Sequence, residues 1–426
     1  MKSVIKEKVM VNNLKEIFSI FTAKAVVRNT FASCVNITPT SNNETKYLSI
    51  NTTKKYLLYI HVPFCDNLCP FCTFHKYKHN FEDSNRYFKT LREEIKILKR
   101  KDVKIDSVYI GGGTPLINEK ELRITIKLVK KLFNVDDISC ETDPNHIDVD
   151  KVYRLKGLVK RLSIGVQSFN DEILQQLSRY KRFGSSNEIK QKISKIVGIL
   201  PITNIDLIFN IPNQTEQILR DDIKSAKQLG VEQITTYPLM SSDLNASFLK
   251  SKQINRNEQK FYNIIKEQLE DYSKNNMWSF SKKVVDLSDE YVSTHEEYIG
   301  VGSGAFSYLD GKLFINAFDL KEYENRIITK EDALMAKSEF ENINKIEYAV
   351  LSSLFGGKLD IEKFNKLYDV NLEKLLRKEL YLVKKLDVIR IEEGVIYPTK
   401  FGEYLLVIMM ASFYSGMDKV RAMFRK

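Results

Sequence analysis

The 426-residue sequence has few of the features that mark secreted or membrane proteins. It contains only five cysteines, three of them within positions 65–72, so we expect no disulfide framework and a reducing, cytoplasmic location. No run of 18 or more apolar residues occurs, which predicts no transmembrane helix. The first residues, 1–8, are not followed by the apolar core of a secretory signal, and we find no internal repeat.

Acidic residues are too few to balance the basic ones. The chain has 66 Lys and Arg against 55 Asp and Glu, a net charge of +11. No basic segment with interleaved aromatic residues accompanies this excess, so nucleic acid is not an expected partner. A basic surface suits an acidic small molecule such as a polycarboxylate. The length, with 43% hydrophobic residues, predicts two or three domains with substantial cores.

Short apolar strands alternate with amphipathic helices through the middle of the chain. Strands are predicted at 56–61, 107–110, 138–142, 161–166, 204–209 and 233–237, and helices at 84–98, 119–133, 149–155, 171–177 and 215–229. Gly230 is a good C-terminal cap for the last of these helices. Alternating strands and helices predict a parallel sheet, and six units predict a partial (β/α)6 parallel barrel.

Three further parts flank this barrel, for an overall α/β fold class. The predicted division is 1–53, an N-terminal extension; 54–240, the barrel; 241–340, an α+β extension; and 341–426, a C-terminal winged-helix-like domain. Within them we expect a helix at 13–27, a polar linker at 38–53, a helix at 257–272, a hairpin at 388–397 and an apolar helix that includes 401–414. We interpret the last domain as structural or substrate-covering, because a fold alone does not imply DNA binding.

Polar motifs follow the predicted strands at their C-terminal ends. They are the cysteine loop 65–72, the glycine run 111–113, Glu141, Gln167, Asp206 and Tyr237. In barrels of parallel strands this end carries the active site. Six motifs in register are hard to explain by packing alone, so we expect them to share one site.

Cys65, Cys69 and Cys72 stand four and three positions apart. Thiolates are the usual protein ligands of iron–sulfur clusters, and three of them would leave one iron of a four-iron cluster open to an external ligand. The alternative is a structural zinc site, for which His75 or His79 offers a fourth ligand.

The loop and its surroundings resemble the radical S-adenosylmethionine (SAM) enzymes. The run Tyr59-Ile60-His61-Val62-Pro63-Phe64-Cys65 is similar to the oxygen-independent coproporphyrinogen III oxidase group. That group includes the oxidases, haem chaperones, anaerobic haem-degrading enzymes and class C methyltransferases. The motifs Gly-Gly-Gly-Thr-Pro, Glu-x-Asp-Pro, Gly-Val-Gln-Ser-Phe and Asp-Leu-Ile follow in the family's order, so the resemblance covers residues 55–310.

The resemblance implies that Cys65, Cys69 and Cys72 hold a catalytic [4Fe–4S] cluster. It places nine residues around SAM: Tyr59, Phe71, Gly112, Gly113, Thr114, Glu141, Gln167, Arg179 and Asp206. Structural alternatives are core filling for the aromatic residues, a tight turn for the glycines, and a surface charge on a helix for Arg179. The implied partners are a tetrapyrrole substrate and an electron donor such as flavodoxin or ferredoxin.

Two departures from the group's pattern concern the substrate. Biosynthetic oxidases usually carry a further cysteine where this chain has Phe74, and haem chaperones carry His-Asn-x-x-Tyr-Trp where this chain has 294–299. The expected activity is that of a radical SAM oxidoreductase, oxidative decarboxylation of coproporphyrinogen III. The alternatives are anaerobic haem degradation with methyl transfer and a second SAM, a class C methyltransferase, a haem chaperone, and a regulator that binds DNA.

Overall fold

The structure is a computed structural model that describes residues 36–40, 44–242, 245–250, 258–283 and 297–424. Seven parallel strands form a partial barrel, which confirms the predicted fold class. In spatial order they are β12 (Tyr298–Val301), β2 (Lys55–Val62), β5 (Lys104–Gly112), β6 (Asp137–Thr142), β7 (Arg161–Gln167), β8 (Ile202–Phe209) and β9 (Gln233–Pro238). The six predicted strands are all present, and β12 is a seventh that pairs with β2.

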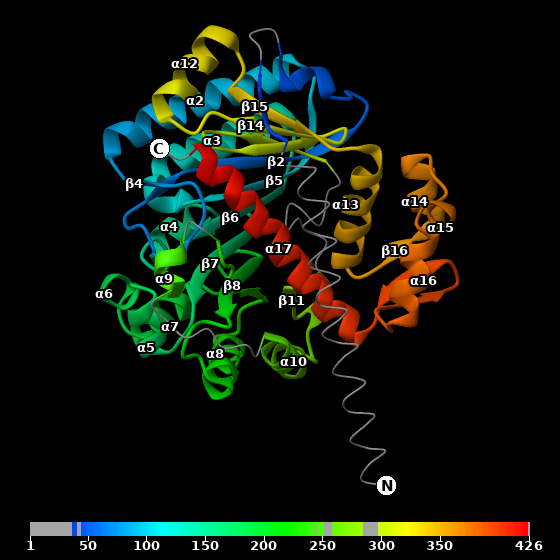
Figure 1. The fold of residues 1–426 in the computed structure, drawn as a ribbon. Coiled ribbons are helices and arrows are strands. Elements are labelled where there is room, and N and C mark those ends of the chain that lie inside the picture. The colour runs from blue at the N-terminus through cyan, green and yellow to red at the C-terminus, as the bar shows by residue number, and fades with distance from the viewer. Residues whose placement is uncertain (1–35, 41–43, 243–244, 251–257, 284–296, 425–426) are drawn as a thin grey trace.

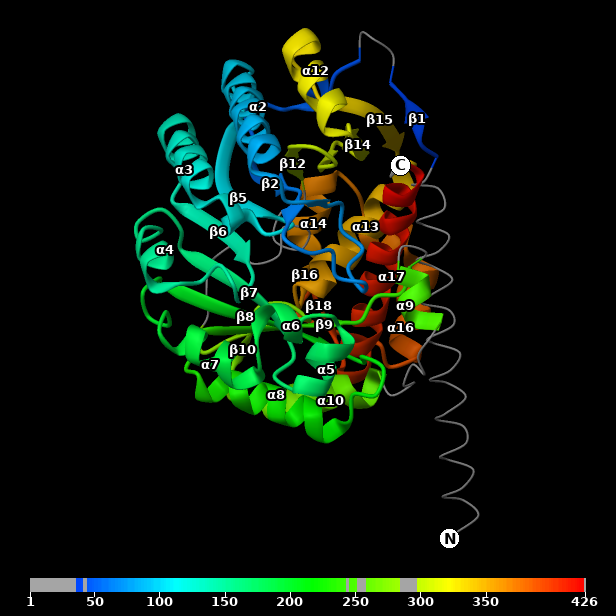
Figure 2. The same ribbon diagram turned by 90° about the vertical axis from the view of Figure 1, so that its left-hand side faces the viewer.

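Helices cover the outer face of this barrel (Figures 1 and 2). They are α2 (Phe81–Arg100), α3 (Glu119–Phe133), α4 (Val149–Tyr153), α5 (Asp171–Gln176), α6 (Tyr180–Phe183), α7 (Ser186–Ser194) and α8 (Glu216–Gln228). The side chain of Asn80 caps α2 by accepting from two backbone N–H groups, and Gly230, with a φ of +77°, follows the end of α8 as predicted. Strand β2 is buried from Tyr56 to Val62, because helices cover its outer face and its inner face lies within the partial barrel.

Antiparallel strands, which the sequence analysis did not locate, extend both edges of the same sheet. One edge continues through β13 (Phe306–Leu309), β14 (Lys312–Asn316), β15 (Leu334–Glu339) and β1 (Thr38–Pro39), and the other through β11 (Ser279–Ser281) and β10 (Ser273–Lys274). Helices α9 (Ala246–Lys250), α10 (Glu258–Gln268) and α12 (Leu320–Lys330) belong to this part. The division into four domains stays a prediction.

The prediction of a linker at 38–53 is wrong. Strand β1 pairs with β15, and the short helix η1 (Lys46–Ser49) buries the whole side chain of Lys46. The polar composition of this segment predicted exposure to solvent. Lys46 is nevertheless buried, because its ammonium group is paired with Glu94 of α2. The helix predicted at 13–27 lies outside the described residues.

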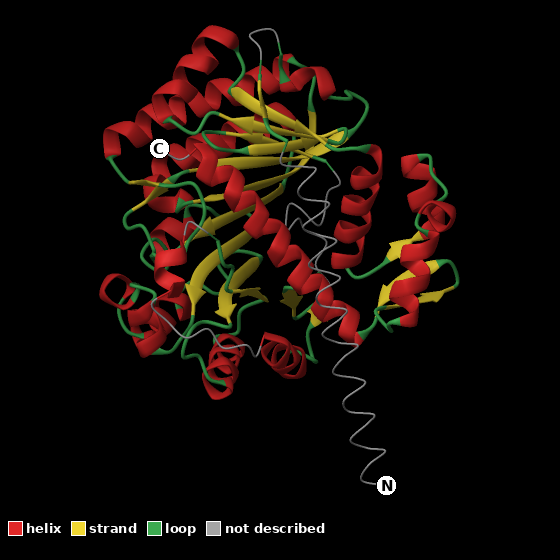
Figure 3. Cartoon of the chain, in the orientation of Figure 1, coloured by secondary structure: helices red, strands yellow, loops and turns green. Residues whose placement is uncertain are grey.

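The C-terminal part is winged-helix-like. It contains α13 (Asn342–Phe355), β16 (Leu359–Asp360), α14 (Ile361–Tyr368), α15 (Leu372–Leu375), α16 (Arg377–Lys385), β17 (Ile389–Glu392), β18 (Val395–Pro398) and α17 (Lys400–Phe424). Helix α17 is longer than the apolar run that predicted it, and it crosses the side of the barrel that the strands leave open (Figures 1 and 3). Over the described part of the chain, no helix has the length and apolarity needed to span a bilayer.

Candidate active site

All twelve residues predicted for the site line one cavity within the partial barrel. The cavity has a volume of about 220 Å³ and is partly open to solvent. The residues are Tyr59, Cys65, Cys69, Phe71, Cys72, Gly112, Gly113, Thr114, Glu141, Gln167, Arg179 and Asp206. Five strands and the cysteine loop thus converge on one space, whereas the role of each residue stays a prediction.

A small sheet and a lysine hold the cysteine loop. Strand β3 (Phe64–Cys65) pairs with β4 (Tyr77–Lys78), beside which the backbone N–H of His79 donates to the carbonyl of Cys65 at 2.8 Å. The buried Nζ of Lys76 donates to the carbonyls of Cys72 at 2.8 Å and Cys69 at 3.4 Å. A buried ammonium needs such acceptors, so Lys76 fixes the turn between these two cysteines.

The positions of two histidines bear on the zinc alternative. Neither His75 nor His79 lines the cavity, and Nε2 of His75 lies 3.1 Å from both the hydroxyl of Ser303 and the carbonyl of Phe318. Within the described ranges, no three His, Cys, Asp or Glu side chains gather closely enough to hold one metal ion. Thiolates that bind separate irons of a cluster do not need to converge in that way.

The glycine run packs directly against the segment that leads into the cysteine loop. Gly112 has a φ of +110°, and a Cβ there would lie 2.4 Å from the ring of His61. A Cβ on Gly113 would lie 2.5 Å from the carbonyl oxygen of Phe64. Packing within the protein therefore requires glycine at both positions, whether or not a ligand also approaches the backbone there.

A chain of hydrogen bonds connects Tyr59 with the residues after the cysteine loop. The hydroxyl of Tyr59 lies 2.9 Å from Nδ1 of His61, and Nε2 of His61 lies 3.0 Å from the carbonyl of His75. Because a carbonyl can only accept, Nε2 carries the ring proton and Nδ1 accepts from Tyr59. Burial lowers the pKa of His61 to about 4, so the ring is neutral at physiological pH.

Glu141 has a carboxyl group whose pKa lies near neutral pH. Its Oε1 accepts from the hydroxyl of Tyr109 at 2.8 Å, and its Oε2 accepts from the N–H of Gly112 at 3.1 Å. Burial raises the pKa of Glu141 to about 7, against the opposing effect of these two donors. A cationic ligand in the cavity would favour the ionised form.

Asp206 lies deeper than predicted, three residues before the end of β8. It accepts from the hydroxyl of Ser163 and the amide of Asn204, both at 2.8 Å. Burial raises the pKa of Asp206, and the charge of Arg161 opposes that shift. Arg161 is only 1% exposed and donates to Gln233 at 2.5 Å; sequence reasoning missed this internal cation because it stands at the start of a strand.

The prediction that Arg179 lies within a helix is wrong. It occupies the turn between α5 and α6, after Ser178 with a φ of +58°. Its side chain is not a surface charge, since the residue is 8% exposed and its guanidinium carbon lies 5.4 Å from the ring centre of Phe71. It donates to the carbonyl of Gly165. Gln167, with a φ of +77°, completes this wall at the end of β7.

Thr114 connects the cysteine loop to a buried aspartate that was not predicted. Its Oγ1 lies 3.8 Å from Sγ of Cys65 and 3.1 Å from Oδ2 of Asp143. Burial raises the pKa of the Cys65 thiol to about 12, against the effect of the Thr114 hydroxyl. Asp143 is the second acid of the Glu-x-Asp-Pro motif, which was the available indication of its importance.

An arginine and a histidine hold Asp143 in place. Nη2 of Arg182 donates to Asp143 at 2.9 Å and to Asp66 at 3.2 Å, and Nδ1 of His146 lies 2.7 Å from Asp143. Although burial raises the pKa of Asp143, bonds to His146 and the charge of Arg182 bring it below its usual value. Since Asp66 directly follows Cys65, this network holds the first part of the cysteine loop against the barrel.

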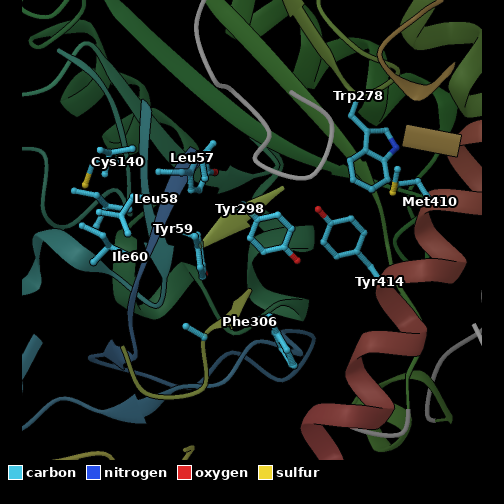
Figure 4. Packing of buried hydrophobic residues seen from close by; sticks show 14 of the residues in the cluster. Leu57, Leu58, Tyr59, Ile60, Cys140, Trp278, Tyr298, Phe306, Met410 and Tyr414 are labelled. Atoms are coloured by element: carbon cyan, nitrogen blue, oxygen red, sulfur yellow. The ribbon is translucent and has the colours of Figure 1, made fainter. Parts of the chain in front are cut away.

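Aromatic residues from distant segments form the other half of the cavity. The rings of Tyr237 and Trp278 are 5.2 Å apart, and those of Trp278 and Tyr414 are 5.6 Å apart. Tyr414 comes from α17 and lies opposite Tyr298, with both hydroxyl groups turned toward the space between the rings (Figure 4). Only Tyr237 was predicted near the site; no local pattern connects Trp278 or Tyr414 with the cysteines.

Comparison with known proteins places these features in a family. Residues 59–226 match the Radical SAM superfamily. The chain is 25% identical to the haem chaperone HemW of Bacillus subtilis over 370 residues, covering 82% of this chain and 96% of that protein. It is also 25% identical to the oxygen-independent coproporphyrinogen III oxidase of Escherichia coli over 389 residues, covering 82% and 83%.

The fold agrees with this relationship. The solved structure of coproporphyrinogen III oxidase (HemN) from Escherichia coli, described as a radical SAM enzyme, matches with a TM-score of 0.69 and 22% identity, over 84% of this chain and 90% of that one. Residues 59–226 are therefore similar to the Radical SAM superfamily, and most of the chain is similar to the oxygen-independent coproporphyrinogen III oxidases and to the haem chaperone HemW.

Proposed function

We propose that this protein is a radical SAM oxidoreductase that acts on a tetrapyrrole. The observation that carries the proposal is the convergence of all twelve predicted residues on one cavity, with three thiols at one side and an aromatic wall at the other. The names of its relatives, a coproporphyrinogen III oxidase and a haem chaperone, support a tetrapyrrole as the ligand.

The residues present fit the cofactors that the family implies. Cys65, Cys69 and Cys72 would hold a [4Fe–4S] cluster, and the polar half of the cavity would take SAM. When bound, these groups would supply an electron and a 5′-deoxyadenosyl radical for hydrogen abstraction from a propionate side chain; loss of CO₂, with transfer of one electron to an external acceptor, would then leave a vinyl group. The initial electron would come from a donor such as flavodoxin or ferredoxin.

The side chains of this protein would bind and orient the amino-acid part of SAM. Glu141 and Asp206 offer carboxylates for an ammonium group, and the Arg179 guanidinium has the paired donors that suit a carboxylate. Phe71 lies beneath Arg179 and contacts an apolar cluster with Ile208, which limits access of water to this side of the cavity. The protein would thus position the cofactor and exclude competing reactions.

Haem binding without turnover is the second candidate. It is favoured by the match to HemW over 96% of that protein's length and by Phe74, which replaces the additional cysteine of the biosynthetic oxidases. Haem opening with methyl transfer is a third possibility and would require a second SAM. These candidates share the cavity and differ in their products.

The test is a set of anaerobic reactions of the cluster-loaded protein with SAM and a reductant. Coproporphyrinogen III or haem is added, and 5′-deoxyadenosine, CO₂ and the masses of tetrapyrrole products are measured. We expect loss of CO₂ from coproporphyrinogen III together with 5′-deoxyadenosine. A linear methylated product from haem would instead establish haem opening, and stoichiometric haem binding without 5′-deoxyadenosine formation would establish the chaperone.

A further inference from the structure

Helix α17 brings a buried ion pair to the edge of the candidate active site. Tyr414, Asp418 and Arg421 are four and three positions apart and share one face of the helix. They are 7%, 1% and 6% exposed, respectively. Tyr414 lines the same cavity as the three cysteines, and α17 runs across the open side of the barrel (Figure 2). The charges of Asp418 and Arg421 therefore lie one to two helical turns beyond a residue of the cavity wall.

Arg421 has its guanidinium behind the cavity wall, next to Phe74, and is not itself among the lining residues. Its guanidinium carbon lies 5.0 Å from the ring centre of Phe74, which lines the cavity two residues after Cys72, and 5.5 Å from that of Phe306. Burial raises the pKa of Tyr298, and the charge of Arg421 opposes that shift. Tyr298 stands opposite Tyr414 (Figure 4), so the charge of Arg421 is felt by the partner of a ring in the cavity wall.

Only one carboxylate oxygen of Asp418 has a hydrogen-bond donor among the residues that the structure describes. Nη1 of Arg421 donates to Oδ1 of Asp418, but Oδ2 is buried and has no hydrogen-bond partner among the residues that the structure describes. A buried carboxylate oxygen without a donor destabilises the folded state, and a buried ion pair is often less stable than apolar side chains of similar volume.

We propose that Arg421 anchors a carboxylate of the substrate and that Asp418 occupies this position while the site is empty. A ligand carboxylate can accept two parallel hydrogen bonds from a guanidinium. The aromatic wall of Tyr237, Trp278 and Tyr414 would contact the apolar body of the same molecule. The inference rests on the proposed function and makes it more specific: the substrate presents a free carboxylate at its edge, and the protein prefers the acid to its ester.

The test compares two probes with the cluster-loaded full chain in the absence of oxygen. Coproporphyrin III has four free carboxylates, and its tetramethyl ester has none. The double variant Asp418→Asn, Arg421→Gln replaces both charged groups with neutral amides, so neither charge remains unpaired. We expect this variant to bind the acid at least about tenfold more weakly and the ester as the unchanged protein does. Lys419→Gln, on the exposed side of the same helix, should match the unchanged protein with both probes.

Asp418→Asn alone supplies a result in the opposite direction. It removes the competing carboxylate and leaves Arg421 charged, so the acid should bind several-fold more tightly. This single variant decides the question if the double variant unfolds, because unchanged or weaker binding of the acid contradicts the anchor. Equal losses for acid and ester in the double variant would also overturn it while the tetrapyrrole function stands. If the unchanged protein binds neither probe, the proposed substrate class is wrong as well.

Discussion

The Nζ atom of Lys46 lies 2.9 Å from Oε1 of Glu94, and neither side chain has any exposed surface. The same Nζ donates to the carbonyl of Gly300 at 2.9 Å, while Oε2 of Glu94 accepts from the N–H of Gly302 at 2.7 Å. A segment before the barrel is thus fixed to the glycine turn that follows β12. The pair holds the edge of the barrel through charges that water does not screen.

Replacing Lys46 with Met should destabilise the protein strongly. The change leaves the buried carboxylate of Glu94 without its cation, which typically costs about 3–5 kcal/mol. The measurement is the midpoint of thermal or urea unfolding. Lys54→Met is the matched control, since Lys54 is 49% exposed in its pair with Glu297 and such pairs contribute at most about 1 kcal/mol. Equal shifts for both variants would contradict the importance of the buried pair.

Cys69→Ala should abolish the brown iron–sulfur absorption and reductive SAM cleavage. The reason is that two thiolates remain where the proposed cluster needs three. Iron content, visible absorption and 5′-deoxyadenosine are the readouts. Cys140→Ala serves as the control, because Cys140 is a buried core residue of β6 that does not line the cavity. Normal SAM cleavage by Cys69→Ala would disprove the proposed ligand set.

SAM affinity should increase with pH around neutrality. Burial raises the pKa of Glu141 to about 7, so the carboxyl group is mostly neutral at pH 6 and mostly ionised at pH 8. If the ionised form binds the ammonium group of SAM, affinity should rise about tenfold over this range. Calorimetric titration of the cluster-loaded protein measures it, and Glu141→Gln should lose the part of the pH dependence that is not due to SAM itself.

Asp222 provides the control for this pH profile. Burial also raises its pKa to about 7, but it bonds Ser168 and the backbone of Phe169 and does not line the cavity. Asp222→Asn should therefore retain the profile of the unchanged protein. If Asp222→Asn abolished the pH dependence and Glu141→Gln retained it, Glu141 would not be the group that titrates.

Arg182→Gln should loosen the cysteine loop. The change removes the cation that bridges Asp66 and Asp143, so the first part of the loop loses its attachment to the barrel. We expect the variant to lose iron to a chelator several-fold faster than the unchanged protein. The loss is measured as the decrease in visible absorption with time. Lys181→Gln, an exposed neighbour, should behave like the unchanged protein. Identical rates for all three proteins would show that the network does not hold the loop.

The sequence allowed prediction of the barrel because its strands have strong local patterns. Residues 56–60 form a continuous apolar run, which is typical of a parallel strand buried on both faces. The short antiparallel strands at the sheet edges lack such runs, since β11 has three residues and β13 has four. Their pairing depends on long-range contacts that local patterns do not encode.

The site residues that belong to sequence motifs could be predicted. Glu141 and Gln167 lie in the last residues of strands β6 and β7, which end at the cavity. Arg179 was predicted in the cavity but on the wrong element, because a positive φ at Ser178 ends the preceding helix without a glycine. Tyr414 could not be found at all, because only the tertiary path of α17 brings it to the cysteines.

The position of α17 has a consequence for the order of events during synthesis. The cysteine loop ends at Cys72, whereas the helix that covers the open side of the barrel begins at Lys400. At about 5–20 residues per second, a ribosome needs tens of seconds to make the intervening chain. During that time the thiols have no chamber around them. Cluster insertion that waits for α17 would avoid placing an oxygen-sensitive centre in an open, half-made protein.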